Sequence, residues 1–494
     1  MLLSELIKDL DIVSKTNFID FEVEKITYDS RDVTPGSAFI CIEGASFDGH
    51  DFIGNAVEVS AGAVLYSNEE KFSKFRDKLT GIRVADTKRA LPVIAMEFYH
   101  HPEKLIKIIG VTGTNGKTTT SILINEILKQ AGKKTALIGT LYIEVDNNII
   151  ETKNTTPSSL DIIKIMSQMV KKGASFLIME VSSHGLDQDR VYGIPYDIAV
   201  FTNFTQDHLD YHGSMDNYFQ AKLKFFKSLR KDKNLHKDPC AVLNADDEKT
   251  PLITESSEAE IFTYGLNNPA DITALDIDIK EEGISYLLKN GKDAPVCVNL
   301  KLLGYFNVYN SLAAIMSALK LGIDKNTVIK AVENIMPVRG RFENINTDKG
   351  FKIIIDYAHT PDGLENLLKS VKKISKGRII TVFGCGGDRD KGKRPVMGGI
   401  AAGYSDIVII TSDNPRSEDP VSIIKQIEEG VVSKTSNYFV EEDREKAIKK
   451  ALESAGKGDF VVIAGKGHET YQIFKDKTVH FDDRETALKI LSKD

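Results

Sequence analysis

The stretch Gly113-Thr114-Asn115-Gly116-Lys117-Thr118-Thr119 follows an apolar run, Leu105–Val111, and precedes a segment in which apolar residues return at helical spacing. This order predicts a strand, a glycine-rich turn and the start of a helix. Backbone N–H groups of such a turn can bind phosphate oxygens, Lys117 adds a mobile positive charge, and the Thr118 hydroxyl can bind Mg²⁺. We therefore interpret the stretch as a phosphate-binding loop for a nucleoside triphosphate.

The loop departs from the usual pattern, which has a glycine about five positions before its second glycine. Val111 stands at that position, so we expect a shortened variant. An ordinary glycine turn between a strand and a helix is the alternative interpretation. The Gly-Lys-Thr ending after an apolar run favours the phosphate loop.

The length and the order of patterns predict an α/β protein of three domains. At 494 residues the chain exceeds what one hydrophobic core usually serves. Strand-like and helical patterns alternate through it, and Pro337–Glu343 interrupts them like a hinge. We expect a small α/β domain over residues 1–100, a central doubly wound sheet over 101–338 and a Rossmann-like α/β domain over 339–494.

Composition limits the partners and the compartment. The formal net charge of −7, with no long Lys/Arg run, argues against general nucleic-acid binding. No apolar stretch approaches the about 18 residues of a membrane helix, so we expect no membrane segment. Isolated cysteines disfavour disulfides or a structural zinc site and indicate a reducing cytoplasm; they are Cys41, Cys240, Cys297 and Cys385.

Two strand ends in the central region carry candidate metal ligands. Glu180 follows the apolar run Phe176–Met179, where a phosphate-loop enzyme would place a metal-binding acid; a chance acid at a strand end is the alternative. The strand Ile198–Phe201 leads toward His208 and His212. Two histidines at this spacing can bind zinc, but the oxygen-rich surroundings favour Mg²⁺. A structural role for either histidine is the alternative interpretation.

One lysine stands out by its position on a predicted helix. Helical spacing places Phe219, Leu223 and Phe226 on one face, and Lys222 falls on that face whereas Lys224 points away. Burial disfavours the ammonium form, and a neutral amine can react with CO₂ to give an anionic carbamate. A lysine that extends its ammonium from an apolar face to solvent is the alternative.

The C-terminal region has two polar turns after strands. The turn Gly384–Arg389 lacks a dinucleotide fingerprint because arginine stands where glycine would be needed, so we exclude a nicotinamide or flavin site. The loop Asp413–Pro420 brings a carboxylate, an amide and a guanidinium together. The guanidinium of Arg416 can hold a carboxylate in a bidentate grip.

These motifs, in this order, resemble those of the Mur ligases of peptidoglycan synthesis, and the resemblance runs through essentially the whole chain. It is closest to the tripeptide-synthetase branch, and Asp413–Arg416 resembles the form found in members that add meso-diaminopimelate rather than lysine. The motifs are Gly113–Thr119, Glu180–His184, Asn203–His212, Lys222, Asn307, Arg341, Asp356–Pro361, Asp413–Arg416 and Gly465–Glu469.

The resemblance implies an ATP-dependent amide ligation on UDP-MurNAc-L-Ala-D-Glu. ATP would phosphorylate the D-glutamate carboxylate, and the amine of a diamino dicarboxylic acid, meso-diaminopimelate or an analogue such as meso-lanthionine, would displace the phosphate. Catalytic roles fall to Lys117, Glu180, His208 and Lys222. Two Mg²⁺ sites are implied, on Thr118 and Glu180 and on His208 and Lys222, with Lys222 present as N6-carboxylysine.

The resemblance also implies binding residues. ATP would contact Gly113, Thr114, Asn115, Gly116, Lys117, Thr118, Thr119, Asn307, Arg341, Asp356 and His359. The uridine diphosphate would contact Tyr28, Ser30, Ala45, Ser46 and Phe47, and the muramyl dipeptide Asn154, Thr155, Thr156, Ser182, Gln188 and Arg190. The amino acid would contact Arg389, Asp413, Asn414, Pro415, Arg416, Gly465 and Glu469.

Three other functions stay open. A lysine-adding Mur ligase would share most of the motifs, and a ligase like folylpolyglutamate synthase would share the shortened loop and the modified lysine. A regulatory nucleotide-binding module would not need Glu180, His208 and Lys222 near the loop. We expect a cytoplasmic monomer.

Overall fold

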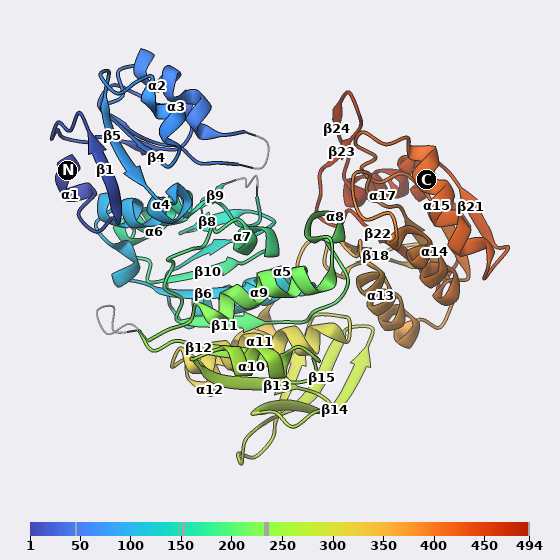
Figure 1. Ribbon diagram of the computed structural model, residues 1–494. Coiled ribbons are helices and arrows are strands. Elements are labelled where there is room, and N and C mark those ends of the chain that lie inside the picture. Colours follow the sequence, from blue (N-terminus) through green and yellow to red (C-terminus); the bar gives the residue numbers. More distant parts are fainter. Residues whose placement is uncertain (45–46, 147, 151–153, 232–236, 493–494) are drawn as a thin grey trace. The chain divides into compact units, whose positions relative to one another are not determined.

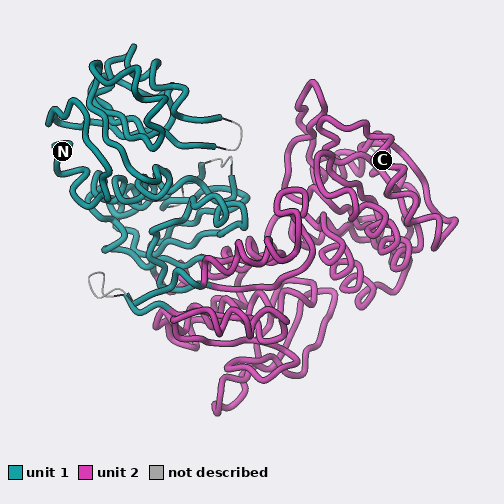
Figure 2. Tube along the Cα trace, in the orientation of Figure 1, with its two compact units in different colours: residues 1–110, 133–199, 227–239 teal, residues 111–132, 200–226, 240–494 magenta. Residues whose placement is uncertain are grey.

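The computed structural model describes residues 1–44, 47–146, 148–150, 154–231 and 237–492. The chain forms two compact units, coloured separately in Figure 2. The first comprises residues 1–110, 133–199 and 227–239, and the second comprises residues 111–132, 200–226 and 240–494. Some strands of the central region are divided between the units.

The N-terminal part of the first unit is a five-stranded sheet of order β1-β5-β4-β3-β2. Neighbouring strands are parallel, except that β1 runs antiparallel to β5. The strands and helices are α1 (Leu3–Leu6), β1 (Ile12–Thr16), β2 (Ile26–Thr27), η1 (Ser30–Asp32), β3 (Ala38–Ile40), η2 (Gly49–Phe52), α2 (Ile53–Glu58), β4 (Ala63–Tyr66), α3 (Glu69–Ser73), β5 (Thr80–Val84) and α4 (Thr87–Phe98).

The rest of the first unit contributes central strands in the order β9-β8-β7-β10-β6-β11. β7 and β10 are parallel and buried, whereas β8 and β9 form an antiparallel edge. The bounds are η3 (Pro102–Lys104), β6 (Lys107–Thr112), β7 (Thr135–Ile138), β8 (Ile143–Val145), β9 (Asn148–Ile150), α6 (Ser159–Lys171), β10 (Phe176–Glu180), α7 (Ser183–Asp187) and β11 (Ile198–Phe201). Glu180 is the last residue of β10, so its side chain lies at the carboxyl end of a parallel strand, where α/β sheets bind ligands.

The second unit begins at Val111, so it includes the phosphate loop and the helix that follows it. It continues the central strands in the order β6-β11-β12-β13-β14-β15-β16. β12, β13 and β14 are parallel, and β14, β15 and β16 form antiparallel hairpins. The bounds are α5 (Lys117–Gln130), α8 (Leu209–His212), α9 (Met215–Lys227), β12 (Cys240–Asn244), α10 (Thr250–Ser256), β13 (Glu260–Gly265), β14 (Ile272–Lys280), β15 (Gly283–Asn290), β16 (Val296–Leu300), α11 (Phe306–Lys320) and α12 (Lys325–Asn334).

A six-stranded sheet of order β17-β18-β22-β19-β20-β21 forms the C-terminal part of the second unit, with a separate β23–β24 hairpin. The six strands are parallel except for the β17–β18 pair. The bounds are β17 (Glu343–Asn346), β18 (Lys352–Asp356), α13 (Pro361–Ile374), β19 (Ile379–Phe383), α14 (Lys393–Tyr404), β20 (Ile407–Ile410), α15 (Pro420–Val432), β21 (Tyr438–Val440), α16 (Arg444–Ser454), β22 (Phe460–Ala464), β23 (Tyr471–Ile473), β24 (Thr478–His480) and α17 (Asp483–Leu491).

Two hydrophobic cores sandwich this C-terminal sheet. Residues of α13, α14 and α15 form the core on one face, and residues of α16 and α17 form the core on the other. Of these helices, α13, α14, α15 and α17 are labelled in Figure 1. The near-continuous apolar strands Ile379–Phe383 and Phe460–Ala464 are fully buried because both faces of a parallel sheet are covered. Polar residues directly follow the strands β18, β19, β20 and β22, so they gather at one edge of the sheet.

The expected α/β class is confirmed, with antiparallel additions that the sequence patterns did not predict. The strand before the phosphate loop and the helix after it lie where expected. The hairpins β14–β15–β16 were not expected, because alternation along a strand does not say whether its neighbours pair with it in parallel or antiparallel. The domain boundaries near residues 100 and 338 stay a prediction.

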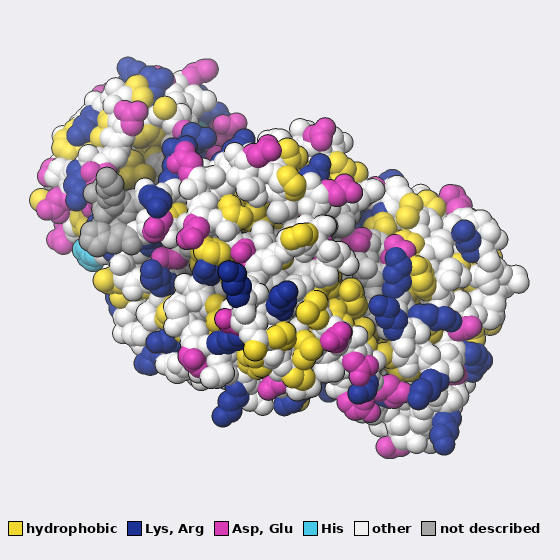
Figure 3. All heavy atoms as spheres, turned by 90° about the horizontal axis from the view of Figure 1, so that it is seen from below, with side chains coloured by type: hydrophobic (Ala, Val, Ile, Leu, Met, Phe, Trp, Pro, Cys, Tyr) yellow, Lys and Arg dark blue, Asp and Glu magenta, His cyan; other side chains and the backbone are white. Residues whose placement is uncertain are grey.

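The charges of the surface are mixed in sign. On the face displayed in Figure 3, lysine and arginine side chains are interspersed with aspartate and glutamate. No helix among the described residues is both long and apolar enough to cross a membrane.

Candidate active site

The phosphate loop requires glycine at two positions. Gly113 has φ +148°, and a Cβ there would lie 1.8 Å from Thr202 Oγ1. Gly116 precedes α5 with φ +86°, and a Cβ there would lie 2.5 Å from Asn310 Oδ1. Side chains at these positions would collide with the walls of the loop, so both positions require glycine.

Contacts with the segment after β11 hold the loop in place. The Thr114 N–H donates to the carbonyl oxygen of Asn203 at 2.8 Å, and the Asn115 N–H donates to Asn203 Oδ1 at 2.9 Å. The Lys117 ammonium donates to the carbonyl oxygens of Gly113 and Thr114 at 3.0 and 2.8 Å. The side chain of Lys117 thus folds over its own loop, and its ammonium lies where the phosphates of a nucleotide would bind.

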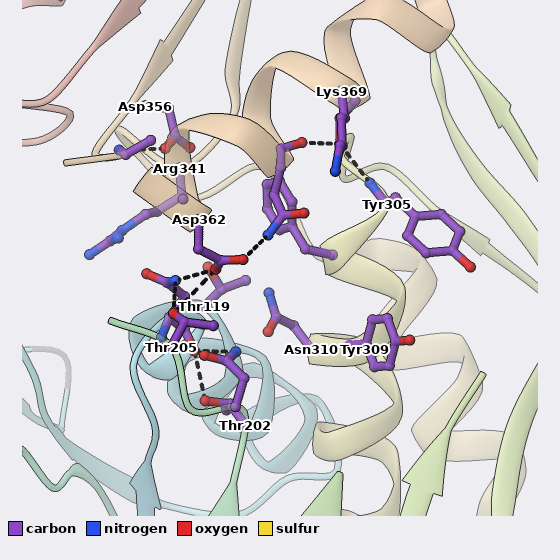
Figure 4. Close-up of a pocket in the computed structure, with 18 of the residues that line it drawn as sticks. Thr119, Thr202, Thr205, Tyr305, Tyr309, Asn310, Arg341, Asp356, Asp362 and Lys369 are labelled. Atoms are coloured by element: carbon purple, nitrogen blue, oxygen red, sulfur yellow. Dashed lines mark hydrogen bonds between the residues drawn. The ribbon is translucent and has the colours of Figure 1, made fainter. Parts of the chain in front are cut away.

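A cavity of about 620 Å³ opens beside this loop, within the second unit (Figure 4). Its walls come from the loop and α5, from the segment after β11, from the start of α11 and from the start of the C-terminal sheet and α13. The volume falls within the range of about 300–1,000 Å³ that is typical of small-molecule sites. Residues lining it include Asn115, Gly116, Thr119, Thr202, Asn203, Thr205, Asn244, Tyr264, Tyr305, Tyr309, Asn310, Arg341, Asp356, His359, Asp362 and Lys369.

Polar side chains from the hinge and the C-terminal sheet reach the loop. Arg341 donates from Nη2 to Thr118 Oγ1 at 3.1 Å, and its guanidinium lies 4.6 Å from the ring centre of Tyr357. Asp362 accepts a hydrogen bond from Asn115 Nδ2 at 2.8 Å and points toward the loop in Figure 4. Asp356 accepts from the backbone N–H of Phe342 and of Ala358; burial raises its pKa, and Arg341 opposes that rise.

Asn307 and Asn310 lie at different depths. Asn310 lines the cavity, whereas Asn307 is buried and does not. The Asn307 amide donates to the carbonyl oxygen of Leu303 at 2.6 Å and accepts from Asn310 Nδ2 at 2.8 Å. Asn307 therefore orients Asn310, and its own contact with ATP stays a prediction.

Lys222 lies behind the loop, as the helical pattern predicted. It is 1% exposed, whereas Lys224 is exposed. Its Nζ donates to the carbonyl oxygen of Gly113 at 2.8 Å and lies 4.6 Å from the ring centre of Tyr218. Burial lowers the pKa of Lys222 well below its usual value, and the charge of Lys117 lowers it further, although Asp207 acts in the opposite direction. Burial thus favours the neutral amine, which is the form that reacts with CO₂.

Asp207, whose charge acts on this lysine, lies close to two histidines. Asp207 Oδ2 lies 3.3 Å from His208 Nε2 and 3.8 Å from His359 Nε2. Burial would raise the pKa of Asp207, but the charges of His208, His359 and Lys393 outweigh it and hold the pKa at about 2. Burial lowers the pKa of His359. His208 precedes α8 with φ +54°, a left-handed backbone that is uncommon outside glycine.

Glu180 belongs to the first unit, where it joins a polar cluster at the ends of β7 and β10. It is 1% exposed and accepts hydrogen bonds from the Thr140 N–H at 2.8 Å and the Thr140 hydroxyl at 2.9 Å. The Thr140 and Thr155 hydroxyls lie 3.1 Å apart. Thr156 is fully buried and donates to the carbonyl oxygen of Glu180 at 3.0 Å.

The predicted dipeptide residues belong to the same cluster. The Ser182 N–H donates to Thr156 Oγ1 at 2.9 Å, and Arg190 donates from Nη1 to the carbonyl oxygen of Thr156 at 3.0 Å. The other guanidinium nitrogen, Nη2, donates to Gln188 Oε1 at 2.6 Å. Asn154 is exposed at the start of this segment. The first unit thus brings Thr155, Thr156, Ser182, Gln188 and Arg190 together.

The predicted uridine residues are more dispersed. The Tyr28 hydroxyl donates to Asp161 Oδ2 at 3.0 Å, Ser30 begins η1, and Phe47 is 76% exposed. Ala45 and Ser46 lie outside the described residues. An aromatic ring exposed to this degree on a loop is available for stacking.

A second polar cluster lies at the carboxyl ends of β20 and β22. The buried ammonium of Lys466 donates to Asn414 Oδ1 at 3.1 Å and to Glu469 Oε2 at 3.0 Å. Asn414 Nδ2 donates to the same Glu469 oxygen at 2.8 Å. Gly465 has φ +111°, and a Cβ there would lie 2.8 Å from Asp413 Oδ2. Sequence reasoning named Asp413, Asn414, Gly465 and Glu469 but missed Lys466, because a lysine in a glycine-rich turn usually extends into solvent.

The pKa values of the two acids of this cluster are shifted in opposite directions. Burial raises the pKa of Glu469, Asp413 raises it further, and Lys466 opposes the rise. Burial also acts to raise the pKa of Asp413, but Lys466 and Arg444 outweigh it and lower the pKa. Arg444 is itself buried and forms a two-bond ion pair with Asp483 at 2.8 Å.

Arg416 lies on the loop beside this cluster. Its Nη1 donates to the carbonyl oxygen of Gly387 at 2.8 Å, and its backbone has φ +52°. Pro415 is buried, and Arg389 is exposed with its guanidinium bonded to the carbonyl oxygen of Asp388. A buried ion pair between Arg394 and Glu418, which sequence reasoning also missed, joins this loop to α14.

The fold and the loop geometry define an ATP-dependent ligase of the Mur type, and the chain belongs to the Mur ligase family. Three family models match it: Mur ligase family, catalytic domain, over residues 22–99; Mur ligase middle domain over 111–318; and Mur ligase, glutamate ligase domain, over 340–467. The three-domain α/β fold class is confirmed.

Particular relatives match the whole chain. Proteins named UDP-N-acetylmuramoyl-L-alanyl-D-glutamate–2,6-diaminopimelate ligase from Syntrophomonas wolfei and Listeria innocua are 46% and 44% identical, covering 99% and 100% of this chain and 99% of each relative. A solved structure of a ligase with this name is 34% identical with a TM-score of 0.67 and covers 95% of both chains. A MurF ligase structure from Thermotoga maritima in complex with ADP, 20% identical with a TM-score of 0.64 and covering 95% of this chain and 97% of its own, shares the fold.

Proposed function

We propose that this chain is the ATP-dependent ligase that adds a diamino dicarboxylic acid to UDP-MurNAc-L-Ala-D-Glu in peptidoglycan precursor synthesis. The observation that carries the proposal is the full-length match to relatives named for 2,6-diaminopimelate addition. The cluster around Asp413, Asn414 and Glu469, together with Arg416, supports the choice of amino acid, because it offers both signs of charge to a zwitterionic head group.

The reaction has two steps. The D-glutamate carboxylate of the nucleotide dipeptide attacks the γ-phosphorus of ATP, which forms an acyl phosphate and releases ADP. The amine of the incoming amino acid then attacks the acyl carbon, a tetrahedral intermediate forms, and phosphate leaves as the amide bond closes. Both steps gather negative charge in one place, so the enzyme must supply donors and cations there and must exclude water.

Residues of the phosphate loop and the hinge supply part of that charge. We assign the β- and γ-phosphates to the loop N–H groups and Lys117, whose ammonium already lies over the loop. Arg341, bonded to Thr118, adds a second fixed cation, and Asp356 and His359 close the opposite wall of the cavity. The adenosine lies in the remainder of the cavity, against Tyr305, Tyr309 and Asn310.

Two Mg²⁺ ions complete the proposal. Thr118 and Glu180 are the candidate ligands of one, and His208 and a carbamylated Lys222 are those of the other. The ions, when bound, neutralise charge on the phosphate oxygens. Lys222 fits this role because it is buried, lies next to the loop and has a lowered pKa. Within the described ranges, no group of three or more His, Cys, Asp or Glu side chains could hold a metal ion, so the sites depend on Thr118 and on the carbamate.

The nucleotide dipeptide is assigned to the first unit. The residues around Thr156 and Arg190 offer hydroxyls and a guanidinium to its acyl and carboxylate groups. Tyr28, Ser30 and the exposed Phe47 are the candidates for the uridine diphosphate. We also propose three domains, with boundaries near residues 100 and 338. We expect the protein to be a monomer and to lie in the cytoplasm.

Phosphate release by the purified protein tests the function. We expect release from ATP only when UDP-MurNAc-L-Ala-D-Glu and meso-diaminopimelate are both present, with the tripeptide product identified by mass. Efficient addition of lysine would contradict the choice of amino acid. Phosphate release that needs a folate and glutamate, and not the sugar nucleotide, would instead indicate a ligase like folylpolyglutamate synthase. A solved structure of that enzyme is 17% identical to this chain and shows a shared fold only.

A further inference from the structure

Lys466 is the one member of the β20–β22 cluster that has no assigned role. Its side chain is fully buried, with its ammonium 5.6 Å from the ring centre of Tyr471. Its ammonium donates two hydrogen bonds, to Asn414 Oδ1 and to Glu469 Oε2. A buried ammonium is costly unless it is paired, so a lysine at this position needs a compensating function or a compensating partner.

The contacts of Lys466 determine which way the Asn414 amide faces. Asn414 Oδ1 receives hydrogen bonds from Lys466 Nζ at 3.1 Å and from the Ile473 N–H at 3.0 Å. Neither group can accept a hydrogen bond, so the atom between them must be the amide oxygen. Nδ2 consequently faces Glu469, to which it donates one of its two hydrogens at 2.8 Å.

This orientation leaves a complementary set of open groups. In the described part of the chain, Asn414 Nδ2 makes one bond, Glu469 Oε1 makes none, and Asp413 Oδ2 makes none. A zwitterionic amino-acid head needs donors for its carboxylate and acceptors for its ammonium. If the Asn414 amide were reversed, its oxygen would face the Glu469 carboxylate and a substrate carboxylate would meet an acceptor.

We propose that Lys466 is a positioning residue for the diamino acid: it holds the Asn414 amide with Oδ1 toward its own ammonium and Nδ2 toward Glu469 and the substrate. The inference rests on the proposed function, because it concerns the site assigned to the amino acid. Lys466 acts through Asn414 and need not touch the substrate. The cation that faces the substrate comes from Arg416 on the neighbouring loop. The ammonium of Lys466 is enclosed by its two partners and is not available to the substrate.

Lys466→Met tests the role, since it keeps the length of the side chain and removes its charge and donors. We expect the KM for meso-diaminopimelate to rise about tenfold to a hundredfold, while the KM values for ATP and the nucleotide dipeptide change less than about twofold. Lys475→Met, at an exposed position on the next hairpin, is the matched control and should leave all three unchanged. An unchanged KM for the diamino acid, or equal rises in all three KM values, would overturn the inference.

A double-mutant cycle with Asn414→Ala separates positioning from general support of the fold. If Lys466 acts through Asn414, the loss in the double variant is no larger than that of the more damaging single variant; if the two losses multiply, the inference is wrong. Lys466→Gln, which retains a donor for Asn414 Oδ1, replaces Lys466→Met in the same cycle should the latter not fold. An inactive wild-type protein would refute the proposed function, whereas an active wild type with multiplicative losses refutes only the role of Lys466.

Discussion

At the scale of single residues, the two lysines that flank Leu223 have opposite surroundings. Lys222 is enclosed behind the phosphate loop and Lys224 is exposed on the same helix. Burial removes water from the first ammonium and favours the neutral amine, so only Lys222 is prepared for carbamylation. The pair therefore offers a test with its own control.

Lys222→Ala should abolish ligation, because the carbamate that we propose as an oxygen ligand cannot form. A short-chain carboxylate such as acetate should restore part of the activity by occupying the vacated position. Lys224→Ala should change the rate of phosphate release by less than about twofold. Equal losses in the two variants, or no restoration by any small acid, would contradict the assignment.

Arg416 provides the second prediction at this scale. Its planar cation suits a carboxylate at the far end of the substrate and repels the terminal ammonium of lysine. We expect the wild type to favour meso-diaminopimelate over lysine by at least about tenfold to a thousandfold in kcat/KM, since a lost buried charged partner costs about 2–5 kcal/mol. Arg416→Ala should remove most of this preference.

Kinetics with three acceptors measure the effect of Arg416. Meso-lanthionine, which carries the same two head groups, should behave like meso-diaminopimelate in both proteins. Rapid lysine addition by the wild type would show that the cation does not select the far carboxylate.

At the scale of elements, the strand–loop–helix unit around Gly113–Thr119 depends on shape as much as on charge. Gly116 combines a left-handed backbone with close approach to Asn310, which belongs to α11. Gly132, just beyond the other end of α5, has a similar φ of +74° but nothing within 4 Å of a Cβ. The two glycines separate steric collision from backbone strain.

Gly116→Ala should prevent productive ATP binding, because the added methyl group would displace the Asn310 amide from the cavity wall. Gly132→Ala should cost only the strain of a left-handed alanine, about 1–2 kcal/mol, and leave the KM for ATP unchanged. Thermal unfolding and calorimetric titration with ATP measure the two effects. The assignment of the loop would be wrong if Gly116→Ala bound ATP as tightly as the wild type does.

At the scale of the whole molecule, the predicted tasks are divided along the chain. The nucleotide dipeptide is assigned to residues of the first unit, and ATP and the amino acid are assigned to residues of the second. Glu180 is the exception, since it lies in the first unit but is proposed to act on the phosphates. The proposed assignments therefore draw on residues of both units.

Lys117→Ala and Glu180→Gln should stop ATP turnover but leave the affinity for UDP-MurNAc-L-Ala-D-Glu within about threefold of the wild type, since both residues act on phosphates rather than on the sugar nucleotide. Calorimetry of the nucleotide dipeptide with each variant measures this. A collapse of that affinity together with turnover would show that the proposed division of tasks is wrong.

Local patterns in the sequence were sufficient for features that depend on neighbours along the chain. The strand, the glycine turn and the helix of the phosphate loop follow from apolar periodicity and from the φ freedom of glycine, and the inward direction of Lys222 follows from helical spacing. The α/β class follows from alternating patterns. The antiparallel hairpins were not predicted because the pairing direction of strands depends on which segments meet in the fold and not on the pattern within one strand.

Only the tertiary structure decided contacts between distant residues. Asp362 meets Asn115 across 247 positions, Asn310 rather than Asn307 lines the cavity, and Lys466 sets the direction of the Asn414 amide. None of these has a periodic signal, since each depends on how strands and helices pack rather than on spacing along one of them. The sequence determined which elements form and which chemistry they carry, and the packing of those elements decided which side chains face a substrate.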